Sequence, residues 1–160
     1  MANASNNELQ NKLEKRQYST FQVGDLFFGI EVVKVQEVLR HQEMTRVPLS
    51  PSVIEGLINL RGQIVTALDM RRRLGLTLAG EEAAPMNMVI RTEDGAVSLL
   101  VDEIGDVIEV PVESYEAVPQ NMPAQQKELI DGVYKLPDRL LLTLNIDRVL
   151  QIQLTSDEGK

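Results

Sequence analysis

An internal repeat constrains the fold of this chain more than any other feature of its sequence. Residues 56–74, GLINLRGQIVTALDMRRRL, align without gaps on residues 132–150, GVYKLPDRLLLTLNIDRVL, at a spacing of 76 residues. The first glycine, the central and final leucines and one arginine coincide, and apolar positions match almost throughout. Residues 32–38 correspond more loosely to residues 101–107. The pattern indicates two copies of one unit, the alternative being a chance similarity between two hairpin–helix segments.

Each copy is predicted to consist of short β-strands. Aromatic residues make up 4% of the chain and tryptophan is absent, so the core must come from Val, Ile and Leu, which suit pleated sheets. Short apolar runs flank the turn signals Gly24-Asp25, Arg61-Gly62-Gln63 and Glu93-Asp94-Gly95. The predicted strands are residues 18–23, 26–31, 57–60, 64–68, 88–92, 96–101 and 107–110.

Three short helices are predicted between these strands. Apolar residues in 32–39 recur at i, i+3 and i+7, which favours a helix, although the β-branched residues there also allow a strand. Ser50-Pro51 is typical of a helix start, and Gly56 would end that helix. Residues 69–74 are predicted to form a third helix, closed by Gly75. The segments predicted as linker and loop are 77–86 and 111–126.

The repeat and the strand pattern together predict an all-β fold. A unit of about 70 residues with short strands cannot easily protect its sheet edges, so we expect each unit to close into a small barrel and the two barrels to pack together. We expect a flexible N-terminal extension over residues 1–16, a single domain of two barrels over 17–152, and a flexible C-terminal tail over 153–160.

The sequence offers no recognisable catalytic or metal-binding pattern. Cysteine is absent, and His41, the single histidine, has no partner implied by spacing. Asp102, Glu103 and Asp106 lack the order of a calcium-binding loop and are predicted to form a solvated acidic edge. Residues 71–73, all arginine, are predicted to be a solvated helix end. We therefore predict a protein that is not an enzyme and has no cofactor or metal.

The charge distribution favours protein partners. The net charge is −8, and it divides unevenly: residues 1–78 hold 10 basic and 8 acidic side chains, whereas residues 79–160 hold 6 and 16. An acidic surface repels a phosphate backbone, so nucleic acid is not an expected partner. The N-terminus lacks an apolar signal segment, and no apolar run approaches the roughly 18 residues of a membrane span. We predict a cytoplasmic protein without direct membrane insertion.

Four segments resemble the CheW family of chemotaxis coupling proteins. They read FQVGDLFFGIEVVKVQEVLR, TRVPLSPSVIEGLINLRGQIVTALDMRRRLGL, LLVDEIGDVIEV and DRLLLTLNIDRVL, and the resemblance covers residues 17–152. It implies two intertwined five-stranded SH3-like β-barrels with a few short helices. It also implies a non-enzymatic adaptor in signalling arrays, which binds the regulatory domain of the histidine kinase CheA and the helical cytoplasmic tip of methyl-accepting chemotaxis receptors.

The resemblance also carries over candidate receptor-binding residues. Val35, Glu37, Gly56 and Arg61 match family positions associated with receptor contact in a groove between the barrels. Other roles stay open for three of them: Val35 as plain core, Gly56 as a helix stop, and Arg61 as an exposed residue of an ordinary turn. The kinase-binding surface is not assigned.

Two other functions are compatible with the same fold. One is a CheW-like adaptor of a non-flagellar system, controlling surface motility or another output. The other is a small β-barrel that binds a ligand or nucleic acid. The low aromatic content argues against the second, because base stacking needs exposed aromatic side chains beside basic ones.

Overall fold

The computed structural model describes residues 14–78, 80 and 84–152. The predicted extension, residues 1–16, lies outside the described residues except for its last three, and the predicted tail, 153–160, lies wholly outside them. The strands are β1 (Lys15–Val23), β2 (Leu26–Glu31), β3 (Val35–Leu39), β4 (Ile54–Leu60), β5 (Gln63–Asp69), β6 (Met86–Thr92), β7 (Gly95–Val101), β8 (Glu103–Pro111), β9 (Tyr115–Glu116), β10 (Ile130–Lys135) and β11 (Leu140–Leu144). The helices are α2 (Met70–Arg73), α3 (Ala124–Lys127) and α4 (Ile146–Val149), with 3₁₀ turns η1 (Val32–Lys34) and η2 (Val112–Ser114).

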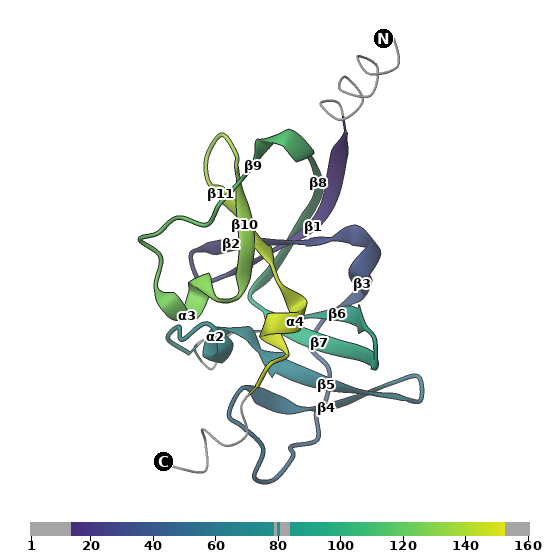
Figure 1. Cartoon of the computed structure of the whole chain (residues 1–160). Helices are drawn as coiled ribbons and strands as arrows, with labels where there is room; N and C mark the ends of the chain where they lie inside the picture. Colours follow the sequence, from purple (N-terminus) through teal and green to yellow (C-terminus); the bar gives the residue numbers. More distant parts are fainter. Residues whose placement is uncertain (1–13, 79, 81–83, 153–160) are drawn as a thin grey trace, which may run out of the picture.

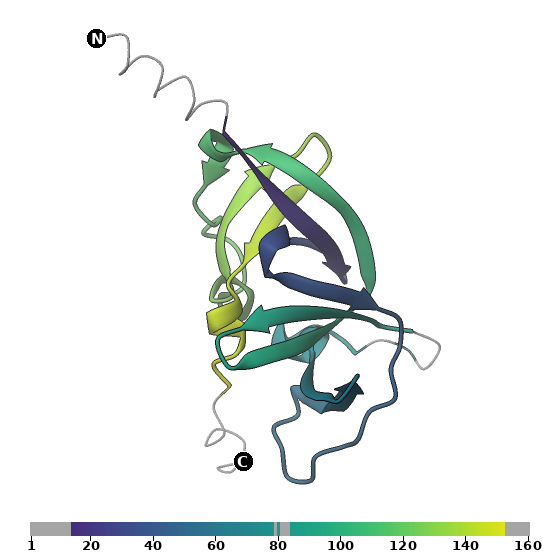
Figure 2. The same ribbon diagram turned by 90° about the vertical axis from the view of Figure 1, so that its right-hand side faces the viewer.

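The strands form two sheets that exchange elements between the halves of the chain (Figure 1). The first sheet has the order β8-β1-β2-β11-β10-β9, so the hairpin of the first half lies among strands of the second half. The second sheet has the order β3-β6-β7-β5-β4, so here the hairpin of the second half, β6–β7, lies among strands of the first half. Figure 2 shows the two curved sheets stacked one above the other. The predicted all-β fold of two intertwined units is confirmed; β9 adds a sixth, two-residue strand to the first sheet.

The strand registers confirm the internal repeat. In the parallel pairs, Thr66 lies opposite Val97, and Leu142 lies opposite Phe28. Thr66 and Leu142 are separated by the 76 residues of the repeat, and Phe28 and Val97 by the spacing between residues 32–38 and 101–107. The two parallel pairs therefore occupy equivalent positions in the two copies. The ladder β4–β5 has a bulge between Ile54 and Gly56, and the equivalent ladder β10–β11 has one between Ile130 and Gly132. A chance similarity would not reproduce both the register and the bulge.

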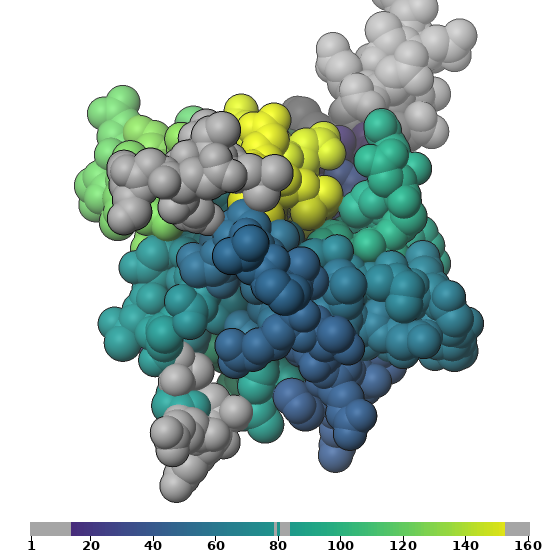
Figure 3. Space-filling model, turned by 90° about the horizontal axis from the view of Figure 1, so that it is seen from below, coloured from purple at the N-terminus to yellow at the C-terminus, as the bar shows by residue number. Residues whose placement is uncertain are grey.

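Two of the three predicted helices are wrong. Within residues 32–39 only η1 is helical, and β3 begins at Val35 because its β-branched residues pair with β6. The segment after Ser50-Pro51 forms turns, and β4 starts at Ile54. The Ser50 hydroxyl donates back to the Val47 carbonyl at 2.8 Å, so it closes a turn and does not cap a helix. Figure 3 shows this connection, residues 40–53 in blue, across the face seen from below.

The helix predicted at residues 69–74 is confirmed. The Asp69 carboxylate accepts hydrogen bonds from the backbone amides of Arg71 and Arg72, which caps α2, and Gly75 follows the helix with φ +72°. Asn145 caps α4 in the same way. Among the described residues, no helix is long and apolar enough to cross a membrane.

One hydrophobic core joins the two sheets. Its largest cluster takes buried side chains from both, including Phe21 and Phe28, whose rings stack with centroids 5.3 Å apart. Each sheet also has a smaller cluster of its own. All three phenylalanines are buried, as Phe27 is only 7% exposed. The three phenylalanine rings are therefore inside the protein and unavailable for base stacking, whereas Tyr115 is 40% exposed.

A half-buried ion pair connects the two sheets, contrary to the prediction of solvated charges. Asp102 lies between β7 and β8, where the chain passes from one sheet to the other, and Arg71 lies on α2. The Arg71 guanidinium donates to both carboxylate oxygens, at 2.9 and 2.6 Å, and the backbone amide of Gly24 donates at 2.7 Å. Burial alone would raise the pKa of Asp102, but the Arg71 guanidinium and the Gly24 amide outweigh it and lower that pKa.

Arg73 also corrects the prediction of a solvated helix end. Its guanidinium donates to the carbonyls of Val149 and Arg148, at 3.0 and 2.9 Å, at the end of α4. The N-terminal neighbour, Arg72, behaves as predicted, since its side chain is 38% exposed and its ion pair with Asp69 is 3.4 Å long. Two of the three consecutive arginines therefore fix tertiary structure, because successive residues of a helix face different directions.

Candidate functional site

Val35 and Glu37 lie on β3, an outer strand of the five-stranded sheet. The ladder between β3 and β6 contains a bulge between these two residues, which leaves Gln36 as the extra residue. In a regular strand, Val35 and Glu37 would point to the same face; a bulge changes this direction. Val35 is half-buried and packs against the main core, whereas the Glu37 carboxylate reaches Arg61 at the surface.

Arg61 occupies the turn between β4 and β5. Both turn residues have positive φ, +52° for Arg61 and +90° for Gly62, which is the conformation of a tight two-residue hairpin turn. The Asn59 side chain stabilises the turn, because its oxygen accepts a hydrogen bond from the Gly62 amide at 2.9 Å. The Arg61 side chain is 70% exposed, so the turn presents a guanidinium group to solvent.

An ion pair between Glu37 and Arg61 connects the two outer strands of this sheet. The Arg61 guanidinium donates to the Glu37 carboxylate, and the Gln36 amide donates to the same carboxylate oxygen at 3.4 Å. The Arg61 guanidinium, assisted by the Gln36 amide, holds the pKa of Glu37 below its usual value. The pair therefore stays charged at neutral pH and forms a polar rim on the surface.

Gly56 lies inside β4 and is buried. A Cβ atom there would lie 2.8 Å from the Thr45 carbonyl oxygen and 3.1 Å from the Met44 Cβ. Leu57 and Thr45 exchange backbone hydrogen bonds of 2.8 and 2.9 Å over the same place. Gly56 is thus not a helix stop: it permits the connection 40–53 to pack closely on β4.

The four predicted receptor-binding residues are only partly brought together. Val35 and Glu37 share one strand, and Arg61 joins Glu37 through the ion pair. Gly56 faces the connection before β4, and any effect on a partner must pass through the backbone. The sequence pattern gave no signal for the pairing of Glu37 with Arg61, because 24 residues and a long connection separate them.

Sequence reasoning also missed Arg91 on β6. Its guanidinium Nη1 donates to the backbone carbonyls of Val33 and Val35, at 3.0 and 2.9 Å. These carbonyls belong to η1 and the start of β3, the segment that carries the predicted site. The available signal was weak: a single basic residue within an apolar run, MVIRT.

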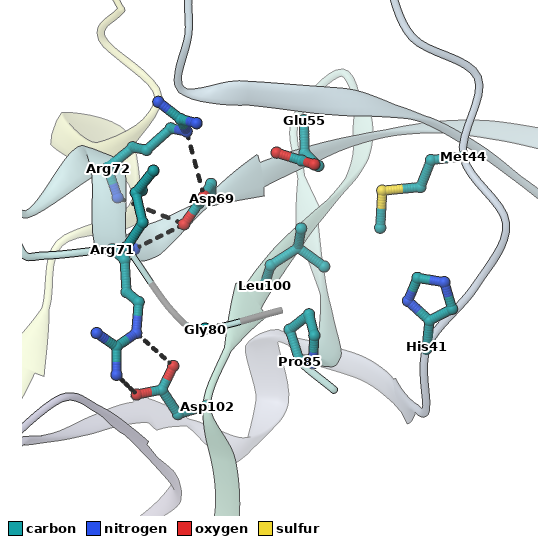
Figure 4. A pocket seen from close by; sticks show the side chains of 11 residues that line it. His41, Met44, Glu55, Asp69, Arg71, Arg72, Gly80, Pro85, Leu100 and Asp102 are labelled. Atoms are coloured by element: carbon teal, nitrogen blue, oxygen red, sulfur yellow. Dashed lines mark hydrogen bonds and ion pairs between the residues drawn. The ribbon is translucent and has the colours of Figure 1, made fainter. Parts of the chain in front are cut away.

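A cavity of about 260 Å³ lies beside α2 (Figure 4). Arg71 and Arg72 both line it, but each is occupied by a carboxylate, Asp102 or Asp69. His41, at the opposite side, is exposed, as predicted. Among the residues that the structure describes, no group of three acidic, histidine or cysteine side chains could hold a metal ion.

Comparison with known proteins gives one consistent result. The family model for the CheW-like domain matches residues 17–153. "Chemotaxis protein CheW" of Treponema pallidum is 29% identical over 140 residues, which cover 85% of this chain and 82% of that protein. The Bacillus subtilis protein of the same name is 32% identical and covers 81% of this chain and 83% of its own length. The crystal structure of the scaffolding protein TtCheW from Thermoanaerobacter tengcongensis superposes with a TM-score of 0.79 at 23% identity, covering 88% of this chain and 95% of that one.

Proposed function

Because the chain belongs to the CheW-like domain family, it is a non-enzymatic chemotaxis adaptor, and we propose that it binds two specific partners. One is the cytoplasmic tip of methyl-accepting chemotaxis receptors, and the other is the regulatory domain of the histidine kinase CheA. The protein would work in the cytoplasm and be recruited to membrane-associated receptor arrays. Its contribution is geometric: it holds receptor and kinase together so that receptor state changes the equilibrium of the kinase.

The ion pair between Glu37 and Arg61 carries the proposal for the receptor surface. A helix that docks on a protein needs an apolar contact for its buried stripe and polar groups at the rim to fix its orientation. The pair supplies the rim, and apolar side chains accompany it along the chain: Val38 on β3 is 38% exposed and Ile64, two residues beyond the Arg61-Gly62 turn, is 60% exposed. Val35 supports the strand from the core side, and Gly56 shapes the backbone behind the turn.

We propose that the kinase binds at a different surface. An adaptor that couples two partners must hold both at once, so the two binding surfaces cannot overlap. A further requirement is unequal affinity for the two signalling states of the receptor, because a partner with equal affinity for both states shifts no equilibrium.

The test is a pair of calorimetric titrations of the purified protein, with the kinase regulatory domain and with a receptor tip fragment. Arg61→Glu is expected to weaken receptor binding about tenfold or more through like-charge repulsion with Glu37 and loss of the rim. Kinase binding is expected to stay unchanged. Arg46→Glu, an exposed arginine in the connection before β4, is the matched control for the change in charge.

The charge-swapped variant Glu37→Arg with Arg61→Glu separates two roles of the rim. Recovery of receptor binding would show that the ion pair acts by holding the two outer strands together. Continued loss would show that Arg61 contacts the receptor directly. Failure of the wild-type protein to bind either folded partner would refute the proposed function.

A further inference from the structure

Arg91 holds the segment that carries the proposed receptor surface. One guanidinium nitrogen, Nη1, donates to two carbonyls, Val33 at 3.0 Å and Val35 at 2.9 Å, and so spans the passage from η1 into β3. This passage directly precedes the bulge that separates Val35 from Glu37. A charged donor shared by two carbonyls fixes their relative position more firmly than a neutral side chain would.

The equivalent ladder in the six-stranded sheet shows that the fold itself does not need this arginine. The pair of Val35 with Ile90 in the ladder β3–β6 corresponds to the pair of Ile104 with Phe21 in the ladder β8–β1. A bulge occurs at the same place in both ladders. The residue after Phe21, equivalent to Arg91, is Gln22.

Gln22 makes no contact of the kind that Arg91 makes. Its amide donates to the Gly24 carbonyl at 3.0 Å, within its own hairpin turn. The bulge of the β8–β1 ladder is held instead by the Thr20 hydroxyl, which donates to the Asp106 carbonyl at 2.6 Å. The same bulged ladder therefore forms with glutamine at this position, and the arginine clamp is a feature of the five-stranded sheet, which carries the Glu37–Arg61 rim.

We propose that Arg91 is a positioning residue for receptor binding. By clamping η1 to the start of β3, it keeps the bulge in the one conformation in which Val35 packs inward and Glu37 meets Arg61. The receptor then docks on a preformed rim and does not have to order it, which is how preorganisation increases affinity. This inference rests on the proposed function, since it assigns Arg91 to the same receptor surface.

The test compares Arg91→Gln, Arg91→Lys and Lys34→Gln. Arg91→Gln introduces the residue that the equivalent β8–β1 ladder has at this position, so the variant should fold, with a cooperative thermal transition. We expect receptor-tip affinity to fall about tenfold and affinity for the kinase regulatory domain to stay the same. Arg91→Lys should recover most of the affinity, because an ammonium group also has several donors for the two carbonyls. Lys34→Gln, which removes an exposed charge from η1, should have little effect.

Backbone amide exchange gives a reading that does not depend on the receptor. In Arg91→Gln, the amides of Gln36 to Leu39 should exchange faster, while those of β8 should not change. The role of Arg91 would be overturned if Arg91→Gln bound the receptor tip as tightly as wild type, or if Lys34→Gln lost as much affinity as Arg91→Gln. Either result would leave the proposed receptor surface standing. A wild-type protein that binds the kinase domain but no receptor fragment would overturn the receptor surface and this role with it.

Discussion

Removal of the Asp102 carboxylate should destabilise the protein markedly, because this group connects three segments. It accepts two hydrogen bonds from Arg71 and one from the Gly24 amide. A hydrogen bond to a charged group contributes about 1.5–3 kcal/mol when buried, whereas an exposed ion pair contributes about 0.2–1 kcal/mol. The side chains of Arg71 and Asp102 are 24% and 25% exposed, between these cases. We expect Asp102→Ala to lower the free energy of unfolding by about 2 kcal/mol.

Urea denaturation and thermal unfolding would measure this loss, which corresponds to a fall in Tm of about 4–8 °C for a domain of this size. Arg71→Ala and Arg72→Ala form a matched pair on the same helix. Arg72→Ala should cost no more than about 0.5 kcal/mol, because its ion pair is long and exposed. A double-mutant cycle between Arg71 and Asp102 should give a coupling energy of about 1–2 kcal/mol.

The pH dependence provides the decisive check. The pKa of Asp102 is lower in the folded protein than in the unfolded chain, so the ionised group stabilises the fold above the ordinary aspartate pKa near 4. This contribution is lost as the pH falls through the lower, folded-state pKa. The stability difference between wild type and Asp102→Ala should therefore be constant from about pH 6 to 8 and shrink below about pH 4. A loss under about 0.5 kcal/mol at pH 7, or a difference that persists in acid, would refute the reasoning.

Three further changes test other parts of the structure. Gly56→Ala should destabilise the protein by about 1–3 kcal/mol in urea denaturation, because the new Cβ would lie 2.8 Å from the Thr45 carbonyl oxygen, and an unchanged midpoint would contradict this. Leu49→Asn should raise stability by about 0.5–1 kcal/mol, since Leu49 is fully exposed with φ +63°, a conformation that asparagine tolerates better; a lower Tm would count against this. In an NMR titration, the pKa of Glu37 should lie below its usual value and rise in Arg61→Gln, whereas equal values in both proteins would exclude the ion pair in solution.

The hairpins were predictable from the sequence because their signals are local. Short apolar runs flank Gly24-Asp25 and Arg61-Gly62, and each turn contains a glycine, which adopts positive φ. The helix after Asp69 was equally visible, with its cap and its closing glycine next to it in the chain. The repeat went further, since it indicated two similar units before any strand pairing was known.

The failures occurred where a distant partner decides the local structure. Residues 32–39 have a spacing that suits a helix, but pairing with β6, about 50 residues further along the chain, makes residues 35–39 a strand. Asp102 and Arg71 looked like surface charges because their contact depends on where the chain passes between sheets. Pairings of this kind, including Glu37 with Arg61, leave no signal at short spacing in one sequence.

The exchange of strands between the halves makes this molecule a tethered dimer of two similar units. For separate units, completion of each barrel would depend on protein concentration, whereas a short covalent connection fixes the local concentration of the partner unit, typically in the millimolar range. Such a tether also allows the two copies to diverge. Where one copy has Glu37 and Arg61, the other has Asp106 and Pro137, so an ion pair of this kind is possible in only one of two equivalent places. A duplicated fold can thus present two surfaces that share a strand arrangement and differ in chemistry.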